Sequence, residues 1–109
     1  MKVKKRIVGE VAVLDVSGDV DMYTSPKLRE ALAGLTRGRV RKIVVNLGDV
    51  KFMDSSGIAT LVQAYKEVRP FEGEVRLAAP GGNVLRVFQL SNLTSMFPIF
   101  DTVEEAVEA

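Results

Sequence analysis

Two residue types that dominate enzyme chemistry, cysteine and histidine, are absent from this chain. Without cysteine the chain forms no disulfide, no thiol nucleophile and no cysteine-based zinc site. Without histidine it builds no Ser-His-Asp triad, and it lacks the side chain that most often transfers protons near neutral pH. We therefore expect no metal site, no cofactor and no enzymatic activity, and favour a binding protein.

The chain also lacks an excess of one charge. Its 15 Lys and Arg residues nearly balance its 14 Asp and Glu residues, which gives a formal net charge of +1. Nucleic-acid binding usually needs a stronger basic excess on one face. The one local cluster fits a solvated edge strand whose lysines discourage pairing with other strands: Lys2, Lys4, Lys5 and Arg6. The sequence therefore predicts no nucleic-acid partner.

Long apolar runs are missing as well. No stretch resembles the apolar part of a signal peptide, and none is long enough to span a bilayer. The 109 residues, of which 47% are apolar and 27% are charged, have the length and composition of one globular domain. We expect a single domain over residues 1–109 that lies in the cytoplasm and does not insert into a membrane.

Strand and helix patterns alternate along the chain. Strand patterns cover residues 3–8, 11–16, 42–47, 74–79 and 98–100, and helical patterns follow the second and every later strand. Ser25 and Asn83 are the expected N-caps of the first and third helices, with Pro26 at the first helical position. The β-branched run Ile43-Val44-Val45 predicts a central strand buried on both faces. The predicted fold is α/β, in the order β-β-α-β-α-β-α-β-α, with a mixed, mostly parallel sheet packed against helices.

The most informative segment is Asp54-Ser55-Ser56-Gly57, which opens the second helix just after the predicted central strand. A helix N-terminus carries unpaired N–H groups and the positive end of the helix dipole, and so accommodates a phosphate. A phosphate on Ser55 would add about −1.5 to −2 charges. With Asp54 and Asp21 nearby, that charge would repel a partner bound there. An ordinary helix cap at Asp54 or Ser55, with Gly57 packed closely on the sheet, explains the same spacing, and a capping serine can also accept phosphate.

A resemblance to a known family rests on four segments: Gly18-Asp19-Val20-Asp21, Asn46-Leu47, Phe52-Met53-Asp54-Ser55-Ser56-Gly57 and residues 84–91. Together they resemble the bacterial anti-sigma factor antagonists of the STAS-domain family. The order of strands and helices fits that family across nearly the whole chain. The resemblance implies a STAS-like single domain.

The resemblance also implies a mechanism. An unmodified antagonist binds an anti-sigma factor that is itself a serine kinase, and thereby frees a sigma factor. The kinase phosphorylates the first serine after the motif aspartate, which releases the antagonist, and a metal-dependent serine phosphatase resets it. On this chain the acceptor is Ser55, with Ser56 as second choice. Its expected setting comprises Asp21, Asp54, Ser56 and Gly57.

We expect the partner to bind the loop after the second strand and the exposed face of the second helix. Thr24 is the weakest member of this set, because a local cap explains it as well. The predicted partner-binding residues are Asp19, Asp21, Thr24, Thr60, Gln63 and Glu67.

Two other functions remain open at this point. STAS domains also serve as unswitched subunits of transporters or stress-signalling complexes. Separately, Asp19-Val20-Asp21 has the Asp-x-Asp spacing of haloacid-dehalogenase-type phosphatases, although a turn explains it better. The apolar segment 96–100 is either an exposed partner patch or, as we prefer, part of the core.

Overall fold

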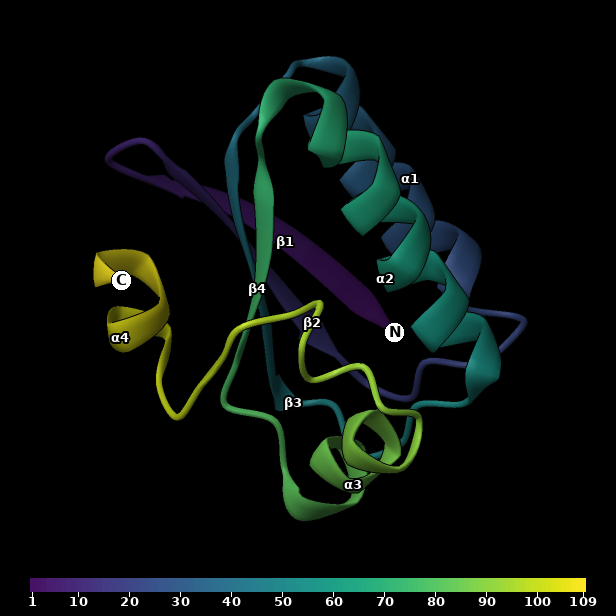
Figure 1. Ribbon diagram of the computed structural model, residues 1–109. Helices are drawn as coiled ribbons and strands as arrows, with labels where there is room; N and C mark the ends of the chain where they lie inside the picture. Colours follow the sequence, from purple (N-terminus) through teal and green to yellow (C-terminus); the bar gives the residue numbers. More distant parts are fainter.

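The computed structural model covers residues 1–109 and forms one mixed sheet with helices on both faces (Figure 1). The order of elements confirms the predicted one, apart from a short 3-10 turn, η1, after the second helix. The elements are β1 (Lys2–Val8), β2 (Val11–Ser17), α1 (Ser25–Arg37), β3 (Lys42–Asp49), α2 (Ser55–Val68), η1 (Arg69–Phe71), β4 (Glu74–Ala78), α3 (Gly82–Leu90), β5 (Ile99–Phe100) and α4 (Val103–Glu108).

The sheet has five strands in the order β1-β2-β3-β4-β5. β1 pairs antiparallel with β2, and the other neighbouring strands are parallel. β3 is therefore the central strand, and its run Ile43-Val44-Val45 is fully buried, as predicted. A β-branched run of this kind is suited to a strand covered on both faces.

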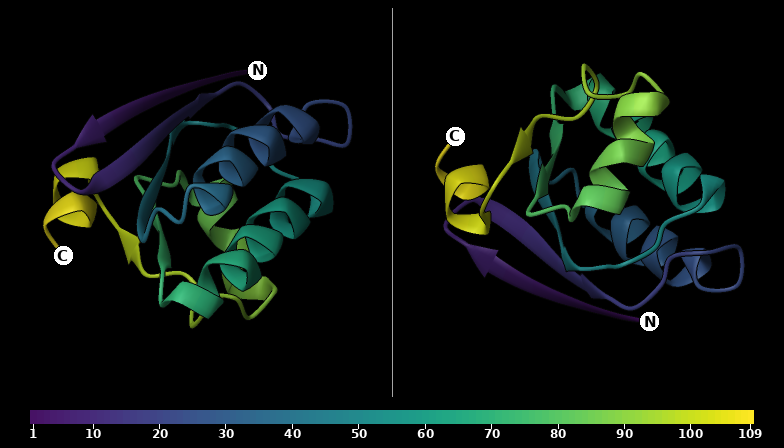
Figure 2. Two further views of the ribbon diagram at one scale, coloured as in Figure 1. Left: turned by 90° about the horizontal axis from the view of Figure 1, so that it is seen from above. Right: turned by 90° about the horizontal axis from the view of Figure 1, so that it is seen from below.

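Helices α1, α2 and α3 cover one face of the sheet, and α4 covers the other (Figure 2). The larger core of 20 buried residues lies under α1, α2 and α3, whereas the core under α4 has five. Phe97 is fully buried in the larger core. The segment 96–100 therefore belongs to the core, as preferred above. No helix of the structure has the length and apolar character needed to cross a membrane.

Two predicted helix caps are wrong. α1 begins at Ser25, so Thr24 stands at the N-cap, because the Ser25 N–H already bonds the Asp21 carbonyl at 2.7 Å and starts the helical path early. The N-cap of α3 is Gly81 rather than Asn83, because the Leu85 N–H bonds the Gly81 carbonyl at 2.8 Å. Both helices start one or two residues before the expected position.

The loop from β2 to α1 and the loop from β3 to α2 lie side by side at the same end of the sheet. Val20 and Met53 form an isolated parallel bridge between them. The Val20 N–H bonds the Phe52 carbonyl at 2.9 Å, and the Asp54 N–H bonds the Val20 carbonyl at 3.0 Å. These bonds fix the backbone just before α2 and bring the two predicted site segments together.

Candidate functional site

Ser55 is the first residue of α2, and its side chain is exposed. Its hydroxyl makes no hydrogen bond within the chain, while the backbone immediately before it is held by the bond from Asp54 to Val20. The side chain is therefore accessible, and its position at the surface is fixed by the strand–loop–helix connection.

Ser56 differs from Ser55 although the two are adjacent. Its hydroxyl donates to Asp54 Oδ1 at 2.5 Å, and its N–H donates to the same oxygen at 2.9 Å. Ser56 is half-buried, and its carbonyl accepts from the Thr60 hydroxyl at 2.9 Å. Of the two candidate acceptors, only Ser55 has a free, exposed hydroxyl.

Asp54 is the N-cap of α2 and bonds three of the N–H groups in its first turn. Besides the carboxylate bonds to Ser56, the Asp54 carbonyl accepts from Gly57 N–H at 3.1 Å and Ile58 N–H at 3.2 Å. Of the first-turn N–H groups expected to be unpaired, only that of Ser55 makes no hydrogen bond within the chain, so the expectation holds for one donor and is wrong for the next three. The Ser56 hydroxyl bond lowers the pKa of the Asp54 carboxyl, the Ser56 and Gly57 N–H groups add to this, and burial opposes it.

Gly57 allows the first turn of α2 to lie against the end of the sheet. A Cβ atom at this position would lie 2.6 Å from Met53 Cγ and 2.8 Å from Val20 Cγ1. Both are shorter than real Cβ contacts, so a larger residue would push the helix away from the Val20–Met53 bridge. The predicted close packing of Gly57 is confirmed.

The loop carrying Asp19, Asp21 and Thr24 is a hydrogen-bonded turn. Asp21 Oδ1 accepts from Tyr23 N–H at 2.9 Å, from Thr24 N–H at 3.0 Å and from the Thr24 hydroxyl at 3.2 Å. The Thr24 hydroxyl also donates to the Asp19 carbonyl at 2.9 Å. Asp21 adjoins Val20 and so lies in the loop that contacts Asp54. Nowhere in the chain do three or more carboxylates gather in a way that could hold a metal ion.

The predicted residues of α2 lie along a groove of about 530 Å³ between α1 and α2, which begins at Ser56. Gln63 and Glu67 are exposed, but Thr60 is only 4% exposed. The assignment of Thr60 to the exposed face is wrong, because Thr60 lies on the side of α2 that packs toward α1. The groove is lined by Ser25, Arg29, Ala33, Ser56, Ala59, Thr60, Gln63 and Glu67.

The partner-site prediction missed an exposed apolar group beside Ser55. Met22 is 67% exposed, Tyr23 is 85% exposed and Phe52 is 51% exposed. These three side chains, here called the apolar rim, come from the two loops that the Val20–Met53 bridge joins. The signal in the sequence is a pair of large apolar residues, Met22-Tyr23, inside a predicted loop.

The sequence pattern of the STAS domain matches residues 2–106 of this chain. The chain belongs to the STAS domain family. An anti-sigma-B factor antagonist of Listeria monocytogenes is 28% identical to this STAS domain over 99 residues, which are 91% of this chain and 86% of the relative.

Solved structures agree with the family. An anti-sigma factor antagonist from Mycobacterium paratuberculosis matches with a TM-score of 0.90 at 27% identity, covering 98% of this chain and 91% of the other. The Bacillus cell fate determinant SpoIIAA, solved in its phosphorylated form, matches with a TM-score of 0.78 at 27% identity, covering 98% and 97% of the two chains. The predicted fold class is confirmed.

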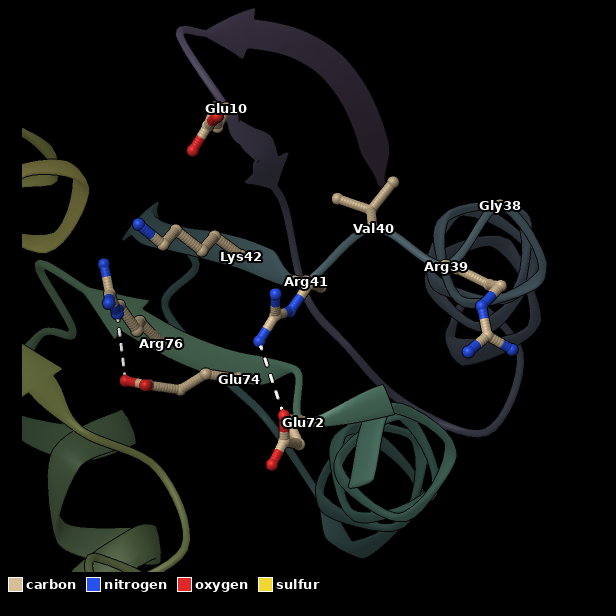
Figure 3. A pocket seen from close by; sticks show the side chains of 9 residues that line it. All are labelled: Glu10, Gly38, Arg39, Val40, Arg41, Lys42, Glu72, Glu74 and Arg76. Carbon is tan, nitrogen blue, oxygen red and sulfur yellow. Dashed lines mark hydrogen bonds and ion pairs between the residues drawn. The ribbon is translucent and has the colours of Figure 1, made fainter. Parts of the chain in front are cut away.

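The opposite end of this STAS domain carries a charged cavity of about 620 Å³ (Figure 3). Arg41 pairs with Glu72 at 3.7 Å, and Arg76 pairs with Glu74 at 2.9 Å. Arg76 is only 6% exposed and also donates to the Ala106 carbonyl of α4 at 2.8 Å. This cavity lies at the start of β3 and β4, away from Ser55. Arg41 and Arg76, two of the charged side chains that line it, form ion pairs within the chain.

Proposed function

We propose that this chain is an anti-sigma factor antagonist switched by phosphorylation of Ser55. The unphosphorylated form binds an anti-sigma factor that is a serine kinase and so frees a sigma factor. The observation that carries the proposal is the exposed, unbonded hydroxyl of Ser55 at the start of α2. Relatives named as anti-sigma factor antagonists, one of them solved in a phosphorylated form, support it.

Electrostatics explains how one phosphate would end the binding. A phosphoserine carries about −1.5 to −2 charges at neutral pH. Because the Ser56, Gly57 and Ile58 N–H groups are already bonded to Asp54, only the Ser55 N–H at this end of α2 is left to neutralise part of this charge. A partner packed on Ser55 would have to desolvate the phosphate beside the Asp54 carboxylate. A loss of about 3–4 kcal/mol would weaken binding some hundreds-fold.

The apolar rim supplies the attraction that this charge would oppose. Met22, Tyr23 and Phe52 are three of the six large apolar side chains that the domain exposes, and their two loops lie next to Ser55. Exposed aromatic residues of this kind are frequent anchors of protein interfaces. We place the partner on the apolar rim and the adjoining groove, where Gln63 and Glu67 contribute polar contacts.

The exposure of Ser55 would also allow a phosphatase to remove the phosphate and so restore the binding form. A metal-dependent serine phosphatase, with the metal in the phosphatase, must reach the phosphorus atom with its own catalytic groups. An acceptor on the surface at the first position of a helix meets that requirement without unfolding of the domain.

Binding of Ser55 variants to the anti-sigma factor kinase of the same organism tests the proposal. Ser55→Ala should bind like the wild type, and Ser55→Asp should bind at least tenfold more weakly with an unchanged melting temperature, because acidic residues are tolerated in the first turn of a helix. Ser56→Asp is no suitable control, since Ser56 holds Asp54. Ser95→Asp adds the same charge at an exposed serine outside the proposed interface and should bind like the wild type. Full binding by Ser55→Asp would instead favour an unswitched subunit.

A further inference from the structure

The Asp54 carboxylate occupies the place at the start of α2 where a phosphate on Ser55 would otherwise bind. Asp54 Oδ1 accepts both the N–H and the hydroxyl of Ser56, at 2.9 and 2.5 Å. The next two N–H groups, of Gly57 and Ile58, bond to the Asp54 carbonyl. The Ser56, Gly57 and Ile58 N–H groups are therefore taken before any phosphate arrives, and only the Ser55 N–H is left without a partner.

Asp54 is also held firmly in that place. Its N–H bonds the Val20 carbonyl at 3.0 Å, and Gly57 packs against Val20 and Met53 behind it. Displacing the carboxylate would break two hydrogen bonds at once and leave the half-buried Ser56 hydroxyl without its acceptor. A phosphate on the neighbouring residue would have to overcome these bonds and the repulsion between two anions.

We infer that Asp54 is a positioning residue that keeps the phosphate of Ser55 off the Ser56 N–H and leaves it exposed to solvent. This inference rests on the proposed function and describes how the same site is regulated. Without Asp54, the phosphate would bond the Ser56 N–H, and the helix dipole would offset part of its charge. With Asp54 in place, the phosphate keeps more of its charge at the surface that a partner must approach.

The test uses the full chain carrying phosphoserine at position 55, in the wild-type and Asp54→Ala backgrounds. One readout is the amide resonance of Ser56, compared with and without the phosphate. In Asp54→Ala we expect phosphorylation to shift that resonance strongly downfield, since the phosphate gains the N–H; in the wild type it should shift little. The other readout is removal of the phosphate by alkaline phosphatase, which should be about tenfold slower in Asp54→Ala, because a charge-assisted hydrogen bond then holds the phosphate.

Two further variants serve as controls. Asp101→Ala removes an exposed carboxylate between β5 and α4 and should match the wild type in both readouts. Asp54→Asn retains an oxygen that can cap the helix, so it stays informative if Asp54→Ala folds poorly; it should move both readouts in the direction of Asp54→Ala by a smaller amount.

Equal Ser56 shifts and equal dephosphorylation rates in the wild type and Asp54→Ala would overturn the inference, because Asp54 would then make no difference to the bonds that the phosphate forms. No partner protein enters this experiment. Failure of the proposed function, seen as partner binding that ignores the phosphate, is therefore a separate result.

Discussion

Both ends of the sheet hold polar groups that bond to one another, but they differ in whether a hydroxyl is left unbonded and exposed. Where β3 leads into α2, the Ser55 hydroxyl has no partner and Tyr23 is largely exposed. At the other end, Arg76 is buried between Glu74 and the Ala106 carbonyl. Groups that satisfy one another stabilise the domain, whereas free and exposed groups are available for binding or modification. Substitutions at the two ends should therefore change different properties.

Arg76→Ala should give the largest loss of stability. The substitution removes the side-chain donor that bonds the buried Ala106 carbonyl, and it leaves a cavity under α4. We therefore expect the free energy of unfolding to fall by about 3 kcal/mol. Arg41→Ala, at the same charged cavity, removes an exposed ion pair with Glu72 and should lower the free energy of unfolding by less than about 0.5 kcal/mol. Urea unfolding measures both, and partner binding should survive in each. Similar losses for the two variants would contradict the structural role of Arg76.

Gly57→Ala should destabilise the site end by about 2 kcal/mol, because the new Cβ would overlap Val20 Cγ1 and Met53 Cγ. Gly34→Ala in α1 is the matched control. Its Cβ would meet no atom within 4 Å, and alanine is the better helix former, so the domain should gain up to about 1 kcal/mol. Thermal unfolding distinguishes the two signs. A stable Gly57→Ala would mean that α2 does not pack on the bridge as described.

Tyr23→Ala should weaken partner binding about tenfold and leave the melting temperature unchanged, because the side chain is 85% exposed and packs on no core. Ile7→Ala, an exposed apolar residue at the tip of the β1–β2 hairpin, is the control at the opposite end and should bind normally. Isothermal titration against the anti-sigma factor kinase measures both affinities. If Ile7→Ala weakened partner binding as much as Tyr23→Ala, the result would contradict an interface centred near Ser55.

Asp54→Asn should give the smallest effect, a loss of stability that is present near neutral pH and disappears in acid. Hydrogen bonding, first from the Ser56 hydroxyl, lowers the pKa of Asp54 below the ordinary 3.8. The charged form therefore stabilises the folded chain above pH 3.8, and this contribution is lost as the pH falls through the lowered pKa. Asp54→Asn should flatten the fall of melting temperature below about pH 4. Asp101→Asn is the control, and an unchanged acid profile in Asp54→Asn would contradict the cap.

Much of the fold could be predicted from the sequence because local patterns and the fold agree. The β-branched run at Ile43 identified the central strand, and Asp54 stood where a cap was expected. The accessibility of Ser55 follows from its place at the first position of a helix that starts at the surface. Each of these features depends on a short stretch of chain.

The remaining features depend on contacts between elements. Thr60 was assigned to the exposed face because only large apolar residues were counted on α2. The side that packs toward α1 is marked by small and hydroxyl-bearing residues that line the groove, Ser56, Ala59 and Thr60. The bonds from Asp54 to the Ser56, Gly57 and Ile58 N–H groups were not predicted, because the cap was not considered as a competitor of the phosphate for the same donors. The apolar rim could not be predicted, because its residues come together only through the bridge between the loops at Val20 and Met53.

The most direct measurement locates the phosphate. The chain is incubated with the anti-sigma factor kinase and ATP, and the modified residue is identified by fragmentation mass spectrometry, with Ser55→Ala treated in parallel. We expect one phosphate, on Ser55, in the wild type and none in Ser55→Ala. A phosphate on Ser56 in the wild type, or equal incorporation by Ser55→Ala, would contradict the assignment of Ser55 as the free acceptor.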